Sequence, residues 1–451
     1  MRSRGTLLLL SFAAALGLYV WLVELRGSAE RMQAETSERR VVDVQADAIV
    51  ALELPLSDGG HVRLVRDGGW RLESPLEFPA DEAAVERALK AIEELEADLT
   101  IEPAPEDLAP FGLSAEARTV VSARTAERTL RLYLGADAPV GSGRYFALGD
   151  DDSRIYTGYG LGLEPLSTTL LGIRDKRLTR WTDQEVKELQ VRVAGSLIVT
   201  ALREADEWRL VAPSEEPADS RQIGRLLQDL VFSRASEFVD DPRDLSTFGL
   251  EFPELQISLA RADGETQSFE VARAGGTAYV RVDSAPVLYA VPERLLDDVP
   301  RTFFDYRAKR VFDLEESAIK RVELRFPRTE SVHRFERREN EWVPDGDSAT
   351  PKPFAIQDLL FVILGLDAVG IEPSDASPAD FALDPASIRI SCIGEEGEEL
   401  GWLELGDQVD DALSARSSQS DRIWRVAADL GEDVPLGLEA FQARFVAAEK
   451  D

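Results

Sequence analysis

The sequence predicts an α+β protein in which an N-terminal transmembrane helix precedes three tandem modules, each an antiparallel sheet with one covering amphipathic helix. Three observations predict this fold class. Residues 6–23 form an uncharged apolar run. The remainder of the chain presents the same series of landmarks three times in the same order. Between these landmarks, short alternating segments separated by tight turns are typical of antiparallel strands.

The apolar run TLLLLSFAAALGLYVWLV has 18 residues, near the shortest length that crosses a hydrocarbon layer of ~30 Å at ~1.5 Å per residue. Arg2 and Arg4 precede it, whereas the charges after it cancel. The positive-inside rule then leaves the N-terminus in the cytoplasm. We expect a protein of the inner (cytoplasmic) membrane, with a single pass and the bulk of the chain in the periplasm. The alternative is a cleaved signal peptide with Gly27-Ser28-Ala29 as its small-residue site.

The repeat is defined by tryptophans, helical stripes and phenylalanine turns. Trp70, Trp208 and Trp342 are 138 and then 134 residues apart. Each is followed by apolar residues with the spacing of a helix that buries one face, namely Val85, Leu89, Ile92 and Leu95, then Ile223, Leu226, Leu227 and Leu230, then Ile356, Leu359, Leu360 and Ile363. Asp81 and Asp219 stand just upstream as N-caps.

A third landmark, Asp107-Leu-Ala-Pro-Phe-Gly-Leu, recurs as Asp244-Leu-Ser-Thr-Phe-Gly-Leu and, more weakly, as Pro378-Ala-Asp-Phe-Ala-Leu. An alternating strand follows each copy, and hairpin turns such as Asp58-Gly-Gly and Asp67-Gly-Gly separate the strands of the first module. The predicted organisation is a cytoplasmic tip at 1–5, the anchor at 6–23, a juxtamembrane stalk at 24–38, and modules at 39–175, 176–308 and 309–451.

Composition excludes several classes of function. The 84 acidic against 51 basic residues give a net charge of −33, which argues against nucleic acid because phosphates require a basic face. One cysteine and two histidines supply neither a disulfide framework nor a Cys/His zinc site nor an ordinary catalytic triad. We therefore expect no catalytic residue, no cofactor site and no metal site.

Each candidate residue has a structural interpretation beside a functional one. His61 and His333 share a module position, and we interpret them as solvent-facing strand residues because no catalytic partners accompany them. The recurrent tryptophans are interpreted as core residues rather than glycan platforms, Phe111, Phe248 and Phe381 as side chains that hold their turns under the helix, and Cys392 as a buried hydrophobe.

The charged clusters are weighed in the same way. Asp150-Asp151-Asp152, Asp240-Asp241, Asp297-Asp298 and Asp410-Asp411 lack the calcium-loop pattern and are interpreted as solvated loops. Two basic spots stand at the predicted module boundaries. They are Lys176-Arg177 with Arg174 nearby, and Lys309-Arg310 with Arg307 nearby. We expect these to join neighbouring modules; the alternative is that they face a partner.

Together, the anchor ending in Gly-Leu-Tyr-Val-Trp, the Trp-Arg-Leu hairpins, the Asp-led helices and the Asp-Leu-x-x-Phe-Gly-Leu turns resemble a bacterial family of unknown function. The resemblance runs from Arg2 through the third module, which departs at Trp342-Val-Pro and Phe381-Ala-Leu. Members of that family are membrane-anchored and accompany gliding-motility-type ABC transporter components. The resemblance implies an extracytoplasmic accessory role beside a transporter and supplies no catalytic residues.

The predicted function is a non-catalytic, membrane-anchored accessory or binding subunit of an ABC-type export or gliding-type system. Its expected partners are the inner-membrane permease and its ATPase, together with other envelope proteins. One alternative is an envelope spacer or adhesin that is independent of a transporter. The other is an extracytoplasmic hydrolase that uses paired carboxylates.

Overall fold

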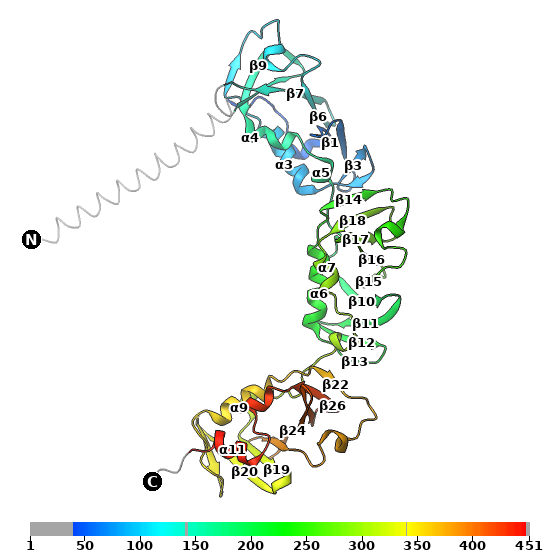
Figure 1. Ribbon diagram of the computed structural model, residues 1–451. Coiled ribbons are helices and arrows are strands. Elements are labelled where there is room, and N and C mark those ends of the chain that lie inside the picture. Colours follow the sequence, from blue (N-terminus) through cyan, green and yellow to red (C-terminus); the bar gives the residue numbers. More distant parts are fainter. Residues whose placement is uncertain (1–38, 140–142, 340, 448–451) are drawn as a thin grey trace, which may run out of the picture. The chain divides into compact units, whose positions relative to one another are not determined.

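The computed structural model describes residues 39–139, 143–339 and 341–447. These residues form three antiparallel sheets with helices between the strands, and each sheet lies within the limits of one predicted module (Figure 1). The predicted tip, anchor and stalk lie outside the described residues, and the module limits themselves stay a prediction. Within the described ranges, no helix combines the length and apolar character needed to cross a membrane.

The first sheet has nine strands in the order β4-β3-β2-β1-β6-β7-β8-β9-β5. Its strands are β1 Ile49–Pro55, β2 His61–Arg66, β3 Trp70–Ser74, β4 Phe78–Pro79, β5 Leu99–Ile101, β6 Thr119–Thr125, β7 Thr129–Asp137, β8 Gly143–Leu148 and β9 Asp151–Tyr159. Its helices are η2 Ala46–Ala48, α3 Glu82–Glu93, η3 Ala109–Phe111, α4 Gly160–Leu163, η4 Glu164–Leu166 and α5 Leu170–Ile173.

The second sheet repeats this order as β13-β12-β11-β10-β15-β16-β17-β18-β14. Its strands are β10 Val186–Val193, β11 Ser196–Glu204, β12 Glu207–Ala212, β13 Glu216–Pro217, β14 Glu237–Asp240, β15 Leu255–Arg261, β16 Thr266–Ala274, β17 Thr277–Val282 and β18 Val287–Val291. Its helices are α6 Ser220–Phe232, η5 Leu245–Phe248, α7 Arg294–Asp297 and α8 Phe303–Tyr306.

The third sheet has eight strands in the order β21-β20-β19-β23-β24-β25-β26-β22. Its strands are β19 Arg321–Phe326, β20 Ser331–Arg338, β21 Glu341–Asp345, β22 Gly370–Ile371, β23 Ile388–Ile393, β24 Glu399–Val409, β25 Ala412–Ser417 and β26 Ser420–Ala427. Its helices are η6 Glu316–Ala318, η7 Pro327–Thr329, α9 Ala355–Leu364, η8 Pro378–Phe381, α10 Leu430–Asp433 and α11 Leu438–Phe445.

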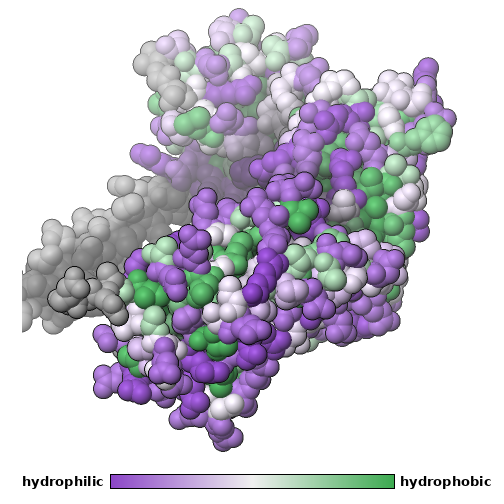
Figure 2. All heavy atoms as spheres, turned by 60° about the horizontal axis from the view of Figure 1, so that its bottom comes forward, coloured by the Kyte–Doolittle hydropathy of each residue, from purple (hydrophilic) through white to green (hydrophobic). Residues whose placement is uncertain are grey.

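One helix per sheet buries the apolar stripe that the sequence predicts. In α3, the predicted Val85, Leu89 and Ile92 are buried in the same core as strand residues such as Leu52 and Leu64. Leu95, also predicted for this stripe, is buried in that core just beyond the end of the helix. The stripes of α6 and α9 are buried in the same way. Each leucine or isoleucine removed from water in this manner contributes about 1.5–3 kcal/mol, which explains why the helix stays on its sheet. Figure 2 shows a visible face that is largely polar, with hydrophobic residues in patches between the polar ones.

The backbone conformation of the Phe-Gly-Leu turns explains why they contain glycine. Each ends a short 3-10 helix in the left-handed region, at Gly112 with φ 66° and at Gly249 with φ 74°. A Cβ on Gly112 would lie 2.6 Å from the backbone nitrogen of Ala136, so a side chain is excluded there. The preceding Phe111 packs edge-on against Tyr145, with ring centroids 5.0 Å apart. The third module adopts the same turn with Ala382 at φ 54°, which explains how it departs from the motif without losing the fold.

The chain forms two compact units. One runs to Arg180 and includes Phe232–Arg243 and Ala285–Pro292, so it contains β14 and β18 of the second sheet. The other consists of Trp181–Val231, Asp244–Ser284 and the chain from Glu293 onward. The segments that link successive modules therefore lie inside a unit, one in each, and their contacts are described separately below.

Candidate functional site

The first junction is the set of side chains around the linker residue Arg174, inside the first unit. The Arg174 side chain is 2% exposed, and its guanidinium lies 4.1 Å from the ring centroid of Phe78 and 3.8 Å from that of Phe238. Phe78 belongs to β4 and Phe238 to β14, and the two rings meet edge to face at 5.3 Å. Tyr289 of β18 completes the aromatic group, 5.2 Å from Phe238. A cation held between two rings in this way is stabilised electrostatically as well as by packing.

Arg174 also forms a two-point ion pair. Its Nη1 and Nη2 donate to the two carboxylate oxygens of Asp240 at 2.9 and 2.8 Å. The planar guanidinium matches the carboxylate fork, a geometry that lysine does not reproduce. Phe78 and Asp240 lie on different sheets, so this single side chain ties the edge of the first sheet to the edge strand of the second.

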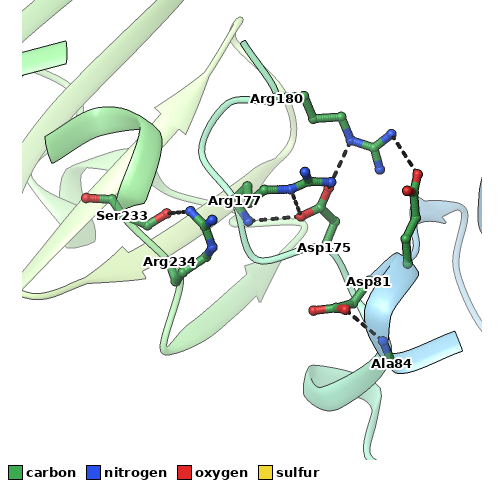
Figure 3. Close-up of polar contacts among 8 residues, drawn as sticks. Asp81, Ala84, Asp175, Arg177, Arg180, Ser233 and Arg234 are labelled. Carbon is green, nitrogen blue, oxygen red and sulfur yellow. Dashed lines mark hydrogen bonds and ion pairs between the residues drawn. The ribbon is translucent and has the colours of Figure 1, made fainter. Parts of the chain in front are cut away.

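A second group of charges surrounds Asp175, the next residue of the linker (Figure 3). Asp175 accepts hydrogen bonds from the backbone nitrogen, Nε and Nη2 of Arg177 and from Nε of Arg180. Burial alone raises the pKa of this carboxyl, but the Arg177 and Arg180 hydrogen bonds outweigh it and hold the pKa below its ordinary value. Arg180 also reaches Glu82, at the start of α3, at 3.9 Å.

The second junction surrounds Arg307, inside the second unit. Arg307 is 7% exposed at its side chain and pairs with Glu216 of β13, whose side chain is 10% exposed. Arg422 of β26 binds the same carboxylate at 2.8 Å. The ring of Phe303 lies beside Arg307 with its centroid 5.4 Å away. Burial lowers the pKa of Arg307, and the attraction of Glu216 only partly compensates.

The backbone around both junctions is the same. At the first, Asp81 N–H donates to the Ile173 carbonyl at 2.8 Å and Asp175 N–H donates to Pro79 at 3.0 Å. At the second, Asp219 donates to Tyr306 and Ala308 donates to Pro217 over the same distances. The linker also pairs with the segment after the next helix, through bridges between Arg177 and Arg234 and between Arg310 and Asp367. Each linker is therefore held on both sides by backbone hydrogen bonds.

The sequence located the arginines of these junctions but missed their partners. The joining role agrees with the contacts of Arg174 and Arg307. Arg177 instead pairs with the neighbouring Asp175, and Arg310 pairs with Asp367 of its own predicted module. The residues it missed are Phe78, Phe238, Asp240, Glu216 and Arg422. Most of these lie on strands of two to four residues, which are too short to show an alternating pattern. The only available signal was position, because Phe78 and Glu216 fall at the same point of successive repeats.

The two histidines differ in their surroundings. His61 is exposed on β2, as expected. His333 does not face solvent, because its ring lies 4.4 Å from that of Phe441 and its pKa is lowered by burial. The helix α11, which brings Phe441 onto this strand, has a weak apolar pattern, and that explains why the sequence did not predict the contact.

The remaining candidates take structural positions. Trp70 and Trp208 are buried, and Trp342 packs against the third core. Cys392 is fully buried in the third core, and this burial raises the pKa of its thiol to about 12. Among the acidic clusters, Asp297 pairs with Arg273, Asp298 with Arg294 and Asp411 with Arg425. Within the part of the chain that the structure describes, no group of three or more His, Cys, Asp or Glu residues could hold a metal ion.

A polar hollow of about 670 Å³ opens beside the third sheet and is a further candidate for ligand binding. It is lined by Glu316, Ser317, Lys320, Arg337, Glu339 and Glu395. Its opposite charges partly neutralise one another, with Arg337 Nη1 3.8 Å from Glu316 Oε1. The junctions are the stronger candidates because the arginines at their centres are buried, which is costly for a charge unless it is paired.

Comparison with known proteins agrees with the repeat. Two stretches, 70–208 and 208–385, match the model of a domain of unknown function (DUF4340). Both matches begin at a tryptophan of the repeat, and together they cover more than half of the chain. No curated protein matches the sequence. The chain belongs to the DUF4340 family.

Proposed function

We propose that this DUF4340 protein is a non-catalytic, membrane-anchored subunit of an ABC-type transport system, and that its modules bind partners outside the cytoplasm. The observation that supports the proposal is where the chain places its buried charge. The charged residues that the structure describes as buried, Arg174, Asp175 and Arg307, all lie in the linkers. Arginine holds its proton throughout the ordinary pH range, so these pairs can hold and orient segments but cannot transfer protons.

The proposed anchor is the segment 6–23, with the N-terminus in the cytoplasm. The tethered modules would then present binding surfaces outside the cytoplasm, next to the permease. The linkers, held by hydrogen bonds and ion pairs, hold neighbouring sheet edges together. A protein of this kind needs ordered surfaces rather than a reactive group, which fits the paired charges at its junctions.

The test is purification of the full-length protein from gently solubilised native membranes, with partners identified by mass spectrometry. We expect an ABC permease and its ATPase in near-stoichiometric amounts. A matched variant in which a cleavable signal replaces residues 1–27 should lose both while still being exported. Recovery of the protein alone, or with outer-envelope components only, contradicts the proposal and favours the spacer or adhesin.

A further inference from the structure

The β5–β9 edge of the first sheet corresponds to the β14–β18 and β22–β26 edges, which take part in the two junctions. In each sheet the outermost strand pairs with the last long strand, and the register places Thr100 opposite Tyr156, Phe238 opposite Tyr289, and Ile371 opposite Trp424. The second and third of these edges receive side chains from the preceding β4 and β13. At the first of these edges, Leu99 and Thr100 of β5 are exposed, and Leu99 is 59% exposed.

This edge also carries both charges that the junctions use. Glu102 follows Thr100 by two positions, as Asp240 follows Phe238, and Asp240 is the residue that holds Arg174. Arg154 precedes Tyr156 by two positions, as Arg422 precedes Trp424, and Arg422 is one of the two arginines that pair with Glu216.

Within the described residues, Glu102 and Arg154 pair with each other. Arg154 Nε lies 2.9 Å from Glu102 Oε2, and the two side chains are 44% and 54% exposed. An exposed pair of this kind contributes little to stability, so exchanging one member for a partner's charge costs little.

We propose that the β5–β9 edge of the first sheet is a docking site for a partner protein segment that presents an arginine to Glu102 and packs an apolar side chain over Leu99 and Thr100. The inference rests on the proposed function, since the partner is a subunit of the same transport system. An arginine fits because it binds a carboxylate at two points, as Arg174 does at Asp240. A basic partner is also attracted by a chain of net charge −33, whereas an acidic one is repelled.

A second copy of this chain does not supply the required chemistry. The bridges Ala80–Arg174, Ala218–Arg307 and Pro351–Val446 mark the same position after each sheet. There the third module has Val446 where the others have arginine, and Ala349 stands where Glu216 stands in β13. Its free edge therefore offers neither charge to the β5–β9 edge of another copy.

The experiment is photocrosslinking in native membranes, with the full-length chain carrying a benzophenone amino acid in place of Thr100. Thr266, an exposed threonine of β16, is the matched control position. We expect a crosslink at Thr100 to an identified arginine-bearing extracytoplasmic segment of the permease, and no equivalent crosslink at Thr266. Glu102→Arg should reduce the yield about tenfold, and replacing the partner's arginine by glutamate should restore it in that variant.

Glu251→Arg, at another exposed acidic position, is the charge control and should leave the yield unchanged. Unchanged circular dichroism and unfolding midpoint of Glu102→Arg show that its effect is not one of folding. Three outcomes overturn the inference. They are crosslinks to a second copy or to residues 1–38 of the same chain, equal yields at Thr100 and Thr266, and a yield that Glu102→Arg leaves unchanged.

The same data separate this inference from the proposed function. If the permease is recovered with the protein but Glu102→Arg changes nothing, the docking site is wrong and the transporter function stands. If the charge exchange succeeds with a protein that belongs to no transport system, the docking edge stands and the transporter function is wrong.

Discussion

The two junctions have the same backbone and different side-chain partners. At the first, the linker arginine finds its carboxylate on the sheet that follows, at Asp240, and lies between two phenyl rings. At the second, Arg307 finds its carboxylate on the sheet that precedes, at Glu216, and Arg422 shares that carboxylate. The backbone bonds to Pro79 and Pro217 fix where each linker arginine lies, so its partner can come from either side. The repeat therefore conserves geometry rather than particular contacts.

Removing the cation at the first junction should have the largest effect. Arg174→Ala abolishes two cation–π contacts, the two-point ion pair and the packing of the arginine stem, and we expect a loss of about 3 kcal/mol in local stability. Hydrogen exchange of the β14 and β18 amides measures this loss. Arg174→Lys should recover only part of it, because lysine keeps the charge without the planar fork.

Arg209→Ala is the matched control, since it removes an exposed arginine paired with Glu204 and Glu215. It should leave the exchange of β14 and β18 unchanged. If Arg174→Ala behaves like this control, the first junction is held by its backbone alone.

Removing the arginine of the second junction should cost less stability. Arg307→Ala leaves the nearly buried Glu216 with Arg422 as its partner, and we expect a loss of about 2 kcal/mol in unfolding of the second unit. The loss is smaller because Arg422 keeps Glu216 paired and because the buried charge of Arg307 is itself costly. A double-mutant cycle with Arg422→Ala should give a coupling energy different from zero, since both cations share one carboxylate. Strictly additive losses would show that the two arginines act independently.

The sequence predicts the repeated parts of this fold well. The spacing of Trp70, Trp208 and Trp342 fixes the repeat, and the buried stripe of each helix follows from its period. Long strands such as His61–Arg66 agree with prediction because alternation over six residues is a clear signal. The Phe-Gly-Leu turn also has a local cause, since its glycine must adopt a positive φ.

The edges that join the sheets were not predictable in this way. β4 and β13 have two residues each, and β5 has three, so no period exists to detect. Their partners are also distant, as Arg174 and Asp240 are 66 residues apart. The junction arginines were found because they stand out on an acidic chain, whereas Asp240 is one carboxylate among 84 acidic residues.

The pH dependence should distinguish the two junctions. The folded-state pKa of Asp175 lies below its ordinary value of 3.8, so its stabilisation is present above that value and is lost as the pH falls through the folded-state pKa. At pH 7, Asp175→Asn should destabilise the first junction by about 1–2 kcal/mol, and the difference from wild type should shrink as the pH falls below 3.8 and vanish below the folded-state pKa. Ala308 occupies this position at the second junction, which should show no such change.

Unfolding of wild type and Asp175→Asn across this pH range, followed by hydrogen exchange in each junction, makes the measurement. A difference that persists undiminished at pH 3 would mean that Asp175 acts through packing and not through its charge.

Removing the aspartate that caps the helix beside each linker should have the smallest effect, and the effect should be equal at the two junctions. Asp81 accepts a hydrogen bond from the Ala84 nitrogen at 2.9 Å and Asp219 accepts one from the Gln222 nitrogen at 3.1 Å, so each caps the helix that begins beside its linker. Asp81→Ala and Asp219→Ala should each cost about 0.5–1 kcal/mol, measured as faster exchange in α3 or α6. Asparagine at either position should behave nearly as wild type, because its side chain also caps. Both residues donate their backbone N–H to the linker, and alanine retains that bond. Unequal losses would therefore show that the two helix starts differ in strength, and the contrast between the junctions would no longer be one of side-chain charge alone.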